Sequence, residues 1–265
     1  MELNYLYGAK ITAAIKKGSA MHAELEGETN IQVDLTPKAF ADVMYKILYT
    51  SYLALEVLFR NKKAREIQIY GMINGYPLVG KMDMLEIRDG ETFVWEDKTK
   101  TSDKPPSDEQ LTSHKAQVIF YKRLLDDIKA GTYTLEKFRK AQRTAFLSIT
   151  PEFVRQLDAM KVDKKLQTVD AIAERYFENL MKLPKISDTI HIKYINQLTG
   201  KEIKLYKFTY SEKEMQDTMD YILKFWKGER ESMPVPEGEK WKCNFCVFFG
   251  DKCKVWWPQK KLAAE

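Results

Sequence analysis

Apolar and polar positions alternate in two stretches of the chain, at 66–70 and 78–98, and together they predict an antiparallel meander. Within the second stretch, Asp89 and Gly90 separate two apolar-rich runs. This dipeptide is typical of a two-residue hairpin turn, because both turn positions need a positive φ. The stretch at 78–98 is therefore predicted to be a β-hairpin that follows the first strand.

The hairpin turn also fixes which side chains face one another. With this two-residue loop, the pairing runs back along both arms and places Asp83 opposite Glu96. Directly paired residues point to the same face of a sheet. Lys98 lies on that face as well, because side chains alternate along a strand. The hairpin is expected to gather two carboxylates and one amine.

Apolar residues at helical spacing predict helices on both sides of the meander. The expected helices cover 3–17, a short segment that carries His22, 37–62 with Thr36 as N-cap and Pro37 at its first position, 107–128 with a capping box of Ser107 and Gln110, 152–182, and 211–227 with Ser211 as N-cap and with Met215, Met219, Ile222 and Trp226 facing inward. A strand at 143–150 and a second hairpin at 189–209 complete the expected elements.

Composition limits the class of protein. The chain has 265 residues and a net charge of +5, from 43 basic and 38 acidic residues, which is compatible with a nucleic-acid partner but does not demand one. No apolar run is long enough to span a bilayer, and the chain does not open with a signal-peptide pattern. We therefore expect an intracellular protein without a membrane partner, in the nucleus or mitochondrion of a eukaryote or in the cytoplasm otherwise.

The two hairpin carboxylates point to metal chemistry. Two unit charges about 5 Å apart repel by roughly 3 kcal/mol at an effective dielectric of about 20. Mg²⁺ relieves such repulsion, since it binds one or two carboxylates and keeps water and substrate phosphates as its other ligands. A lysine beside the metal can orient a water or neutralise charge on phosphate. The residues alone leave a solvated polar hairpin face as an open alternative.

Three cysteines lie together near the C-terminus, at Cys243, Cys246 and Cys253. Thiolates at this spacing can hold an iron–sulfur cluster or zinc. The flanking aromatic residues would shield a cluster from solvent. Unrelated free thiols and a zinc-type interaction module remain alternatives.

Four short motifs, in their order and spacing, resemble the RecB-like branch of the PD-(D/E)XK nucleases. The motifs are Gly18-x3-His22, Gly80-x2-Asp83, Glu96-x-Lys98 and Gln117-x3-Tyr121. Longer stretches resemble the exonuclease V (defects-in-morphology) family, namely REIQIYG, PLVGKMDML, IKYINQLTGKEI and EKWKCNFC. The resemblance runs from about Glu2 to Trp257. CRISPR-associated RecB-like nucleases share the motifs and the cluster, and they remain an alternative.

The resemblance implies an α/β fold with a restriction-endonuclease-like core, a central mixed sheet flanked by helices, and a C-terminal cysteine cluster. We assign the sheet to the meander and the strand at 143–150. The whole chain, 1–265, is then a single nuclease domain, with a core at about 18–150, a helical and hairpin elaboration at 151–235, and a cysteine-rich segment at 240–257.

The resemblance also implies roles for single residues. Catalytic metals would be held by His22, Asp83, Glu96 and the backbone carbonyl of Asp97. Lys98 would be the catalytic lysine, and Gln117 and Tyr121 would position the DNA strand. Independently of the resemblance, Lys100 and Lys104 follow the hairpin in a proline-containing loop, where they can contact phosphates or lie in solvent.

Family members are similar in being single-strand-specific DNA exonucleases that carry a [4Fe–4S] cluster. We therefore expect a monomer that hydrolyses phosphodiester bonds of single-stranded DNA in DNA repair or genome maintenance, with Mg²⁺ or Mn²⁺ as its metal. The alternative from another class is a catalytically silent, nucleic-acid-binding iron–sulfur protein with the same fold.

One departure from the family pattern concerns the cluster. The family binds it with four cysteines, and Met1 stands where the first of them would be. We expect the fourth ligand at or before Met1. A sequence that starts late, a labile three-cysteine cluster and a lost cluster are the three explanations.

Overall fold

The computed structural model describes residues 20, 21, 27, 31–235, 237, 238, 240, 243, 246 and 253. The elements follow one another as a helix, three strands, a run of helices, two strands and a last helix. The elements are α3 (Phe40–Asn61), β1 (Lys63–Ile73), β2 (Tyr76–Arg88), β3 (Glu91–Lys100), α4 (Asp108–Lys129), α5 (Leu135–Gln142), a 3₁₀ turn (Thr144–Phe146), α6 (Pro151–Ala159), a second 3₁₀ turn (Lys164–Leu166), α7 (Val169–Lys182), β4 (Lys185–Asn196), β5 (Glu202–Thr209) and α8 (Glu212–Trp226).

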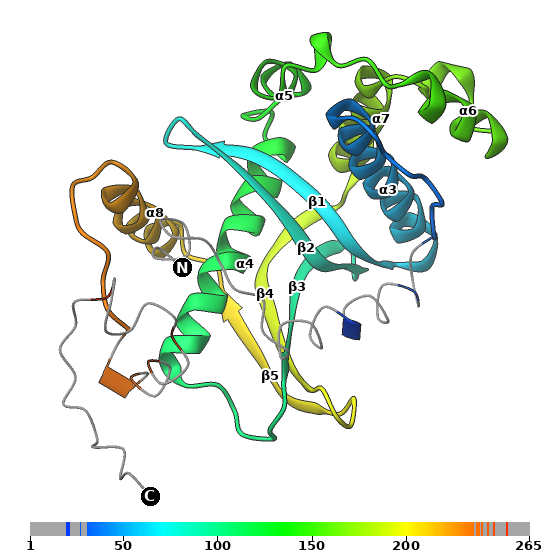
Figure 1. Ribbon diagram of the computed structural model, residues 1–265. Helices are drawn as coiled ribbons and strands as arrows, with labels where there is room; N and C mark the ends of the chain where they lie inside the picture. Colours follow the sequence, from blue (N-terminus) through cyan, green and yellow to red (C-terminus); the bar gives the residue numbers. More distant parts are fainter. Residues whose placement is uncertain are drawn as a thin grey trace, which may run out of the picture.

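The strands form one five-stranded mixed sheet in the order β1-β2-β3-β4-β5. Pairing is antiparallel except between β3 and β4, which run parallel. A parallel pair needs a long crossover, and the helices from α4 to α7 supply it (Figure 1). The expected central mixed sheet flanked by helices is thus confirmed.

Helices cover the sheet in two groups (Figure 1). α4 lies across it in contact with β1, β3 and β4, and α8 packs on α4. α3 packs on β1 and on α7. The core between these layers consists mainly of Leu, Ile, Val and aromatic side chains, as the periodicity of the helices and strands requires.

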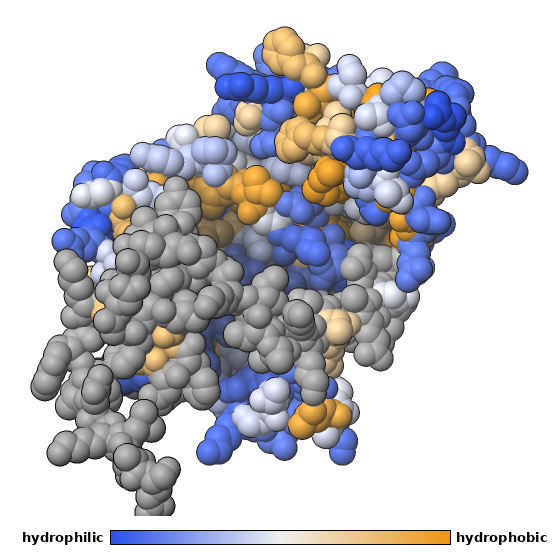
Figure 2. Space-filling model, in the orientation of Figure 1, coloured by the Kyte–Doolittle hydropathy of each residue, from blue (hydrophilic) through white to orange (hydrophobic). Residues whose placement is uncertain are grey.

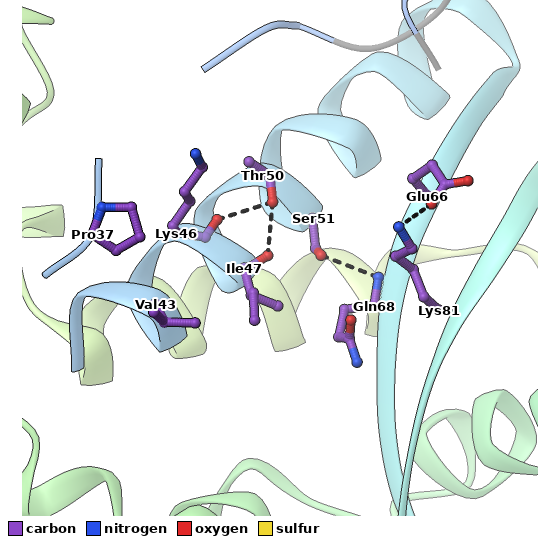
Figure 3. Close-up of a pocket in the computed structure, with 9 residues that line it drawn as sticks. All are labelled: Pro37, Val43, Lys46, Ile47, Thr50, Ser51, Glu66, Gln68 and Lys81. Atoms are coloured by element: carbon purple, nitrogen blue, oxygen red, sulfur yellow. Dashed lines mark hydrogen bonds and ion pairs between the residues drawn. The ribbon is translucent and has the colours of Figure 1, made fainter. Parts of the chain in front are cut away.

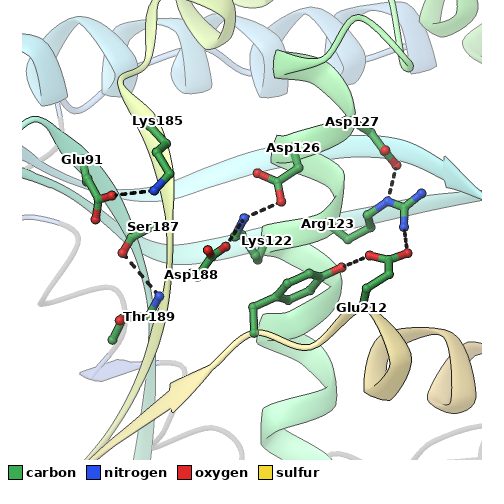
Figure 4. Close-up of polar contacts among 11 residues, drawn as sticks. Glu91, Lys122, Arg123, Asp126, Asp127, Lys185, Ser187, Asp188, Thr189 and Glu212 are labelled. Atoms are coloured by element: carbon green, nitrogen blue, oxygen red, sulfur yellow. Dashed lines mark hydrogen bonds and ion pairs between the residues drawn. The ribbon is translucent and has the colours of Figure 1, made fainter.

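Ion pairs hold α4 against β4 and α8 (Figure 4). Lys122 Nζ lies 3.1 Å from a carboxylate oxygen of Asp188, which belongs to β4. Arg123 binds Asp127 over 2.9 Å and also pairs with Glu212 at the start of α8. Charged groups this close to the core cost free energy unless they are paired. The pairs therefore fix the rotation of α4 and, with it, the side chains that α4 presents to the sheet.

The prediction of a strand at 143–150 is wrong. Residues Thr144–Phe146 form a 3₁₀ turn, and the side chain of Phe146 is 86% exposed. Thr150 instead caps α6, and its backbone N–H and hydroxyl both donate to the buried Asp42. The strand that pairs with β3 on the side away from β2 is β4. The hairpin at 189–209, which we assigned to the elaboration, is present and supplies β4 and β5 to the central sheet.

Two expected helices have different bounds. The stretch at 152–182 is broken between α6 and α7, where Lys161 has a φ of 58° and Thr168 caps α7. α3 begins at Phe40 rather than at Pro37, because the Asp42 carboxylate accepts the backbone N–H groups that precede the helix. In α8, Ser211 is the N-cap as predicted.

The inward stripe of α8 differs from the expected one in its second half, where Leu223 is buried and Ile222 is only half-buried. Met215 and Met219 are buried, whereas Trp226 is 52% exposed at the last turn of the helix. Within the described part of the chain, no helix combines the length and the apolar character that a bilayer crossing requires.

Candidate active site

The β2–β3 hairpin adopts the predicted turn and register. Asp89 and Gly90 have φ values of 51° and 78°, as a two-residue turn of this kind requires. The strands pair from Arg88 with Glu91 to Met84 with Trp95. Asp83 and Glu96 are the next positions along the two strands, where this pairing ends.

The sheet divides at Asp83. Beyond this point β2 continues in contact with β1, whereas β3 continues in contact with β4. The two pairs of strands diverge (Figure 1). In β1, Glu66 has a φ of 55°, an uncommon value for this residue type, at the position across from Asp83. Such local backbone irregularity is often found at functional sites.

A hydrogen bond bridges the point of division. The backbone N–H of Asp97 donates to Asp83 Oδ2 over 2.8 Å. Asp83 is 8% exposed and Glu96 is 1% exposed. Two carboxylates thus lie buried at neighbouring positions on the diverging strands, which is a costly arrangement without compensating charge.

Lys98 supplies positive charge to this pair. Its Nζ lies 2.5 Å from Glu96 Oε1 and donates to Gln117 Oε1 over 3.0 Å. Gln117 in turn donates from Nε2 to the hydroxyl of Tyr121 over 2.7 Å. A continuous chain of polar contacts therefore joins β3 to one face of α4.

Gly80 allows Tyr121 to approach the sheet. A Cβ at Gly80 would lie 2.3 Å from Tyr121 Cε1, so another side chain there would displace the ring. Burial raises the pKa of Tyr121 to about 12, with the charges of Glu96 and Asp83 adding to the rise. The phenol thus keeps its proton at neutral pH and can act as a hydrogen-bond donor.

The side chain of Asp97 points to the other side of β3. It accepts a hydrogen bond from Arg65 Nη1 over 2.7 Å and lies 3.5 Å from Lys193 Nζ. Both cations neutralise a carboxylate that is fully buried. This pairing fixes the backbone of Asp97, and therefore the N–H that binds Asp83.

The structure brings five predicted site residues together. They are Asp83, Glu96, Lys98, Gln117 and Tyr121. Hydrogen bonds join Glu96, Lys98, Gln117 and Tyr121 in that order. Asp83 joins the group through its charge, which acts on Tyr121. Arg65, Lys193, His114 and Tyr194 also border this group. Sequence reasoning missed them because each acts through a partner that is distant along the chain.

Other predicted residues do not join this group. Lys100, the last residue of β3, donates from Nζ to the backbone carbonyl of Pro105 in the following loop, and Lys104 is exposed in that loop. His22 lies outside the described residues. The three cysteines are partly exposed and form no disulfide. Burial raises the pKa of Cys243, and the charges of Cys246 and Cys253 add to the rise.

The described side chains fit part of a metal site. Carboxylate oxygens are the donors that Mg²⁺ prefers and that also suit Mn²⁺, and Asp83 and Glu96 provide them from adjacent strands. Among the residues that the structure describes, no group of three His, Cys, Asp or Glu side chains is arranged to hold a metal. The expected ligand set has two further members, the Asp97 carbonyl and His22.

A pocket of about 260 Å³ lies between α3 and the β1–β2 pair (Figure 3). Lys46 and Lys81 line it together with Glu66, which forms an ion pair with Lys81. Lys81 precedes Asp83 by two residues on β2. Figure 2 shows apolar and hydrophilic side chains next to one another on the face over β1 and β2. The pocket therefore contains two lysines, one of which lies two positions from Asp83 along β2.

Comparison with known proteins gives a family match over most of the chain. A family model described as "Exonuclease V - a 5′ deoxyribonuclease" matches residues 1–96 and 159–257. The chain belongs to the exonuclease V family. It is also 24% identical over 239 residues to Exonuclease V of Danio rerio, an alignment that covers 88% of this chain and 60% of that protein. The chain thus spans less than two thirds of that relative's length.

The exonuclease V match covers part of the site. Asp83, Glu96 and the three cysteines lie within the matched residues, whereas Lys98, Gln117 and Tyr121 fall between the two matched segments. Among solved structures, the crystal structure of SSO0001 aligns with a TM-score of 0.35 at 16% identity, covering 91% of this chain and 96% of that one.

Proposed function

We propose that this chain is a metal-dependent exonuclease that hydrolyses single-stranded DNA from its 5′ end. The observation that carries the proposal is the position of Lys98, which is held between Glu96 and Gln117 beside the buried Asp83. Membership of a family described as a 5′ deoxyribonuclease supports the substrate and the polarity. A role in genome maintenance and action as a monomer belong to the same proposal.

Asp83, Glu96, His22 and the Asp97 carbonyl would hold the Mg²⁺ or Mn²⁺. When bound, such an ion lowers the pKa of a water ligand and offsets the charge of the phosphate group. The hydrogen bond from Asp97 N–H to Asp83 and the ion pairs of the Asp97 side chain keep these donors in place. The protein therefore sets the donor positions before substrate arrives, which lowers the reorganisation that the reaction needs.

Lys98 acts on the reacting phosphate. The Lys98 side chain is 23% exposed, so its ammonium group can reach a bound phosphate while Glu96 and Gln117 hold it. There it stabilises the negative charge that develops in the transition state. Tyr121, a neutral donor held by Gln117, would contact the DNA strand in this proposal.

The pocket between α3 and the β1–β2 pair would receive the DNA next to the scissile bond. Lys46 gives it net positive charge, since Lys81 is paired with Glu66, and phosphate contacts of this kind position a nucleic acid without reading its sequence. Binding that does not depend on the base sequence suits an exonuclease that advances along a strand.

Cys243, Cys246 and Cys253 would hold an iron–sulfur cluster in this proposal. The close spacing of the three cysteines in the sequence supports it, as does the backbone hydrogen bond from Cys246 N–H to the Cys243 carbonyl over 3.2 Å. The three thiols are not grouped as metal ligands in the described structure, so binding of the cluster would have to draw them together. Thiolate ligands would have to lose the protons that the raised pKa of Cys243 favours, and bound iron would supply the compensating charge. A cluster absorbs visible light and zinc does not, so the absorption spectrum of the purified protein, with a Cys246→Ser control, separates the two.

The test of polarity and strand choice uses one oligonucleotide in several forms. The forms are single strands labelled at the 5′ or the 3′ end, a covalently closed circle, the blunt duplex and the RNA of the same sequence. We expect early release of the 5′ label from the linear DNA strand and no cutting of the circle. Cutting of the circle would identify an endonuclease, and early release of the 3′ label would reverse the polarity.

A further inference from the structure

Two tyrosines flank the same carboxylate in the proposed active site. The charge of Glu96 acts on Tyr121 of α4 and on Tyr194 of β4, and in both cases it raises the pKa of the phenol. Each phenol is bound by a polar side chain of α4. Gln117 binds Tyr121, and His114 Nδ1 lies 2.6 Å from the hydroxyl of Tyr194.

One face of α4 supplies Tyr121 and the two side chains that bind the phenols. His114, Gln117 and Tyr121 are spaced by three and four residues, so they line one side of the helix. Gln117 binds Lys98 from this side. His114 is therefore the next side chain along the same polar stripe, one turn before the residue that holds the lysine.

Tyr194 lies beside Lys98 in the sheet. The two residues are direct partners in the parallel pairing of β3 and β4. Side chains of such partners lie side by side on one face, with strands about 4.8 Å apart. The Tyr194 ring consequently forms the wall on the β4 side of the lysine, opposite to the Asp83 side.

The Tyr194 ring has little freedom to move. It is 1% exposed, and its edge meets the ring of Tyr206 at an interplanar angle of 78° with centroids 5.8 Å apart. Burial, followed by the charges of Tyr206 and Glu96, raises the pKa of the phenol, which thus keeps its proton. A protonated phenol can donate to His114 Nδ1, and that contact holds the outer end of the ring.

We propose that Tyr194, held by His114, is a positioning residue that keeps the Lys98 ammonium aligned for the reaction. The inference rests on the proposed nuclease function, because Lys98 needs a defined position only if it acts on substrate. His114 and Tyr194 work as one unit, and neither needs to touch the DNA.

The experiment measures kcat and KM on a linear single strand for three variants. Tyr194→Phe removes only the hydroxyl, His114→Ala removes its partner, and the double variant removes both. We expect each single variant to lower kcat about 10-fold with KM within about twofold, which corresponds to the loss of about one hydrogen bond. The double variant should fall no further, because both changes break one contact.

Two further variants separate positioning from general packing. His114→Asn keeps an acceptor for the phenol and should restore most of the lost kcat. Tyr210→Phe is the matched control, since it removes a hydroxyl that binds Glu212 over 2.7 Å at the start of α8. Its kcat should stay within about twofold of the wild type.

The outcomes distinguish this inference from the proposed function. If the wild type itself does not hydrolyse DNA, the proposed function fails and the inference fails with it. If the wild type is active, a Tyr194→Phe variant with unchanged kcat overturns the inference alone. Additive losses in the double variant, a change confined to KM, or an equal loss of kcat in Tyr210→Phe would overturn the inference as well.

Discussion

The backbone N–H of Asp97 donates to the carboxylate of Asp83 over 2.8 Å, at the point where β2 and β3 stop pairing with each other. One side chain thus serves the fold and the proposed metal site together. The carboxylate satisfies a buried donor that lacks a strand partner, and its remaining oxygen is directed by the same contact.

This double role predicts different effects for two substitutions of Asp83. Asp83→Asn keeps an acceptor for the Asp97 N–H, so its free energy of unfolding should stay close to the wild-type value. Asp83→Ala leaves that donor unsatisfied and should lose about 1–3 kcal/mol. Both variants should lose nuclease activity. Denaturant unfolding checks the first difference, and equal stability of the two variants would contradict it.

Lys98 should matter for the rate far more than the neighbouring lysines. Removing a group that stabilises transition-state charge typically costs about 100-fold or more in kcat, and we expect this for Lys98→Ala. Lys104→Ala, a change at an exposed position of the following loop, should leave kcat within about threefold. The hydrolysis rates of the two variants, measured at several metal concentrations, check this prediction. Hydrolysis by Lys98→Ala at the wild-type rate would refute the assigned role.

Two glycines provide a matched test of the Tyr121 position. A Cβ at Gly80 would meet the Tyr121 ring at 2.3 Å, and a Cβ at Gly71 would meet Leu124, one turn further along α4, at 2.4 Å. Gly80→Ala and Gly71→Ala should therefore both lower the melting temperature. Only Gly80→Ala should also lower kcat strongly, because it displaces the ring that Gln117 binds. Comparable kcat losses in both would show that α4 as a whole, rather than Tyr121, matters.

His191 should make the stability depend on pH. Burial, with the charges of Lys207 and Arg88, lowers its pKa to about 4 from an ordinary value of 6.5. Between these values the unfolded chain binds the additional proton, so the free energy of unfolding should fall as the pH falls from about 6.5 to 4, by up to about 3 kcal/mol.

The control for this prediction is His191→Phe. An aromatic ring at this position can still stack on Trp95, whose ring centroid lies 4.0 Å from that of His191. The variant lacks the titrating group, so its stability should vary less over the same pH range. The same slope in both proteins would assign the pH dependence to other groups.

Local signals predicted the parts of the site that lie close together in the sequence. Asp89-Gly90 specified the hairpin and placed Asp83 next to Glu96, and Ser107 with Gln110 set the start of α4 and so the face that carries Gln117. These features depend on turn and cap chemistry within a few residues. The position of Lys98 on the same face as Glu96 followed from alternation along one strand.

Contacts between distant segments could not be predicted in the same way. The apolar run at 143–150 resembles a strand, but Asp42 binds Thr150 from over 100 residues away and keeps it as a helix cap. The parallel pairing of β3 with β4 places Tyr194 beside Lys98, and nothing local to either residue indicates this. The pairing of Arg65 with Asp97 is hidden for the same reason.

The most direct test of the proposed function is hydrolysis of a 5′-labelled linear single strand by the wild type and by Asp83→Asn, each with Mg²⁺ or Mn²⁺ and with chelator. We expect metal-dependent degradation from the DNA end by the wild type and none by the variant, with both proteins folded and able to bind the strand. Binding without cleavage by the wild type, or equal cleavage by the variant, would contradict it.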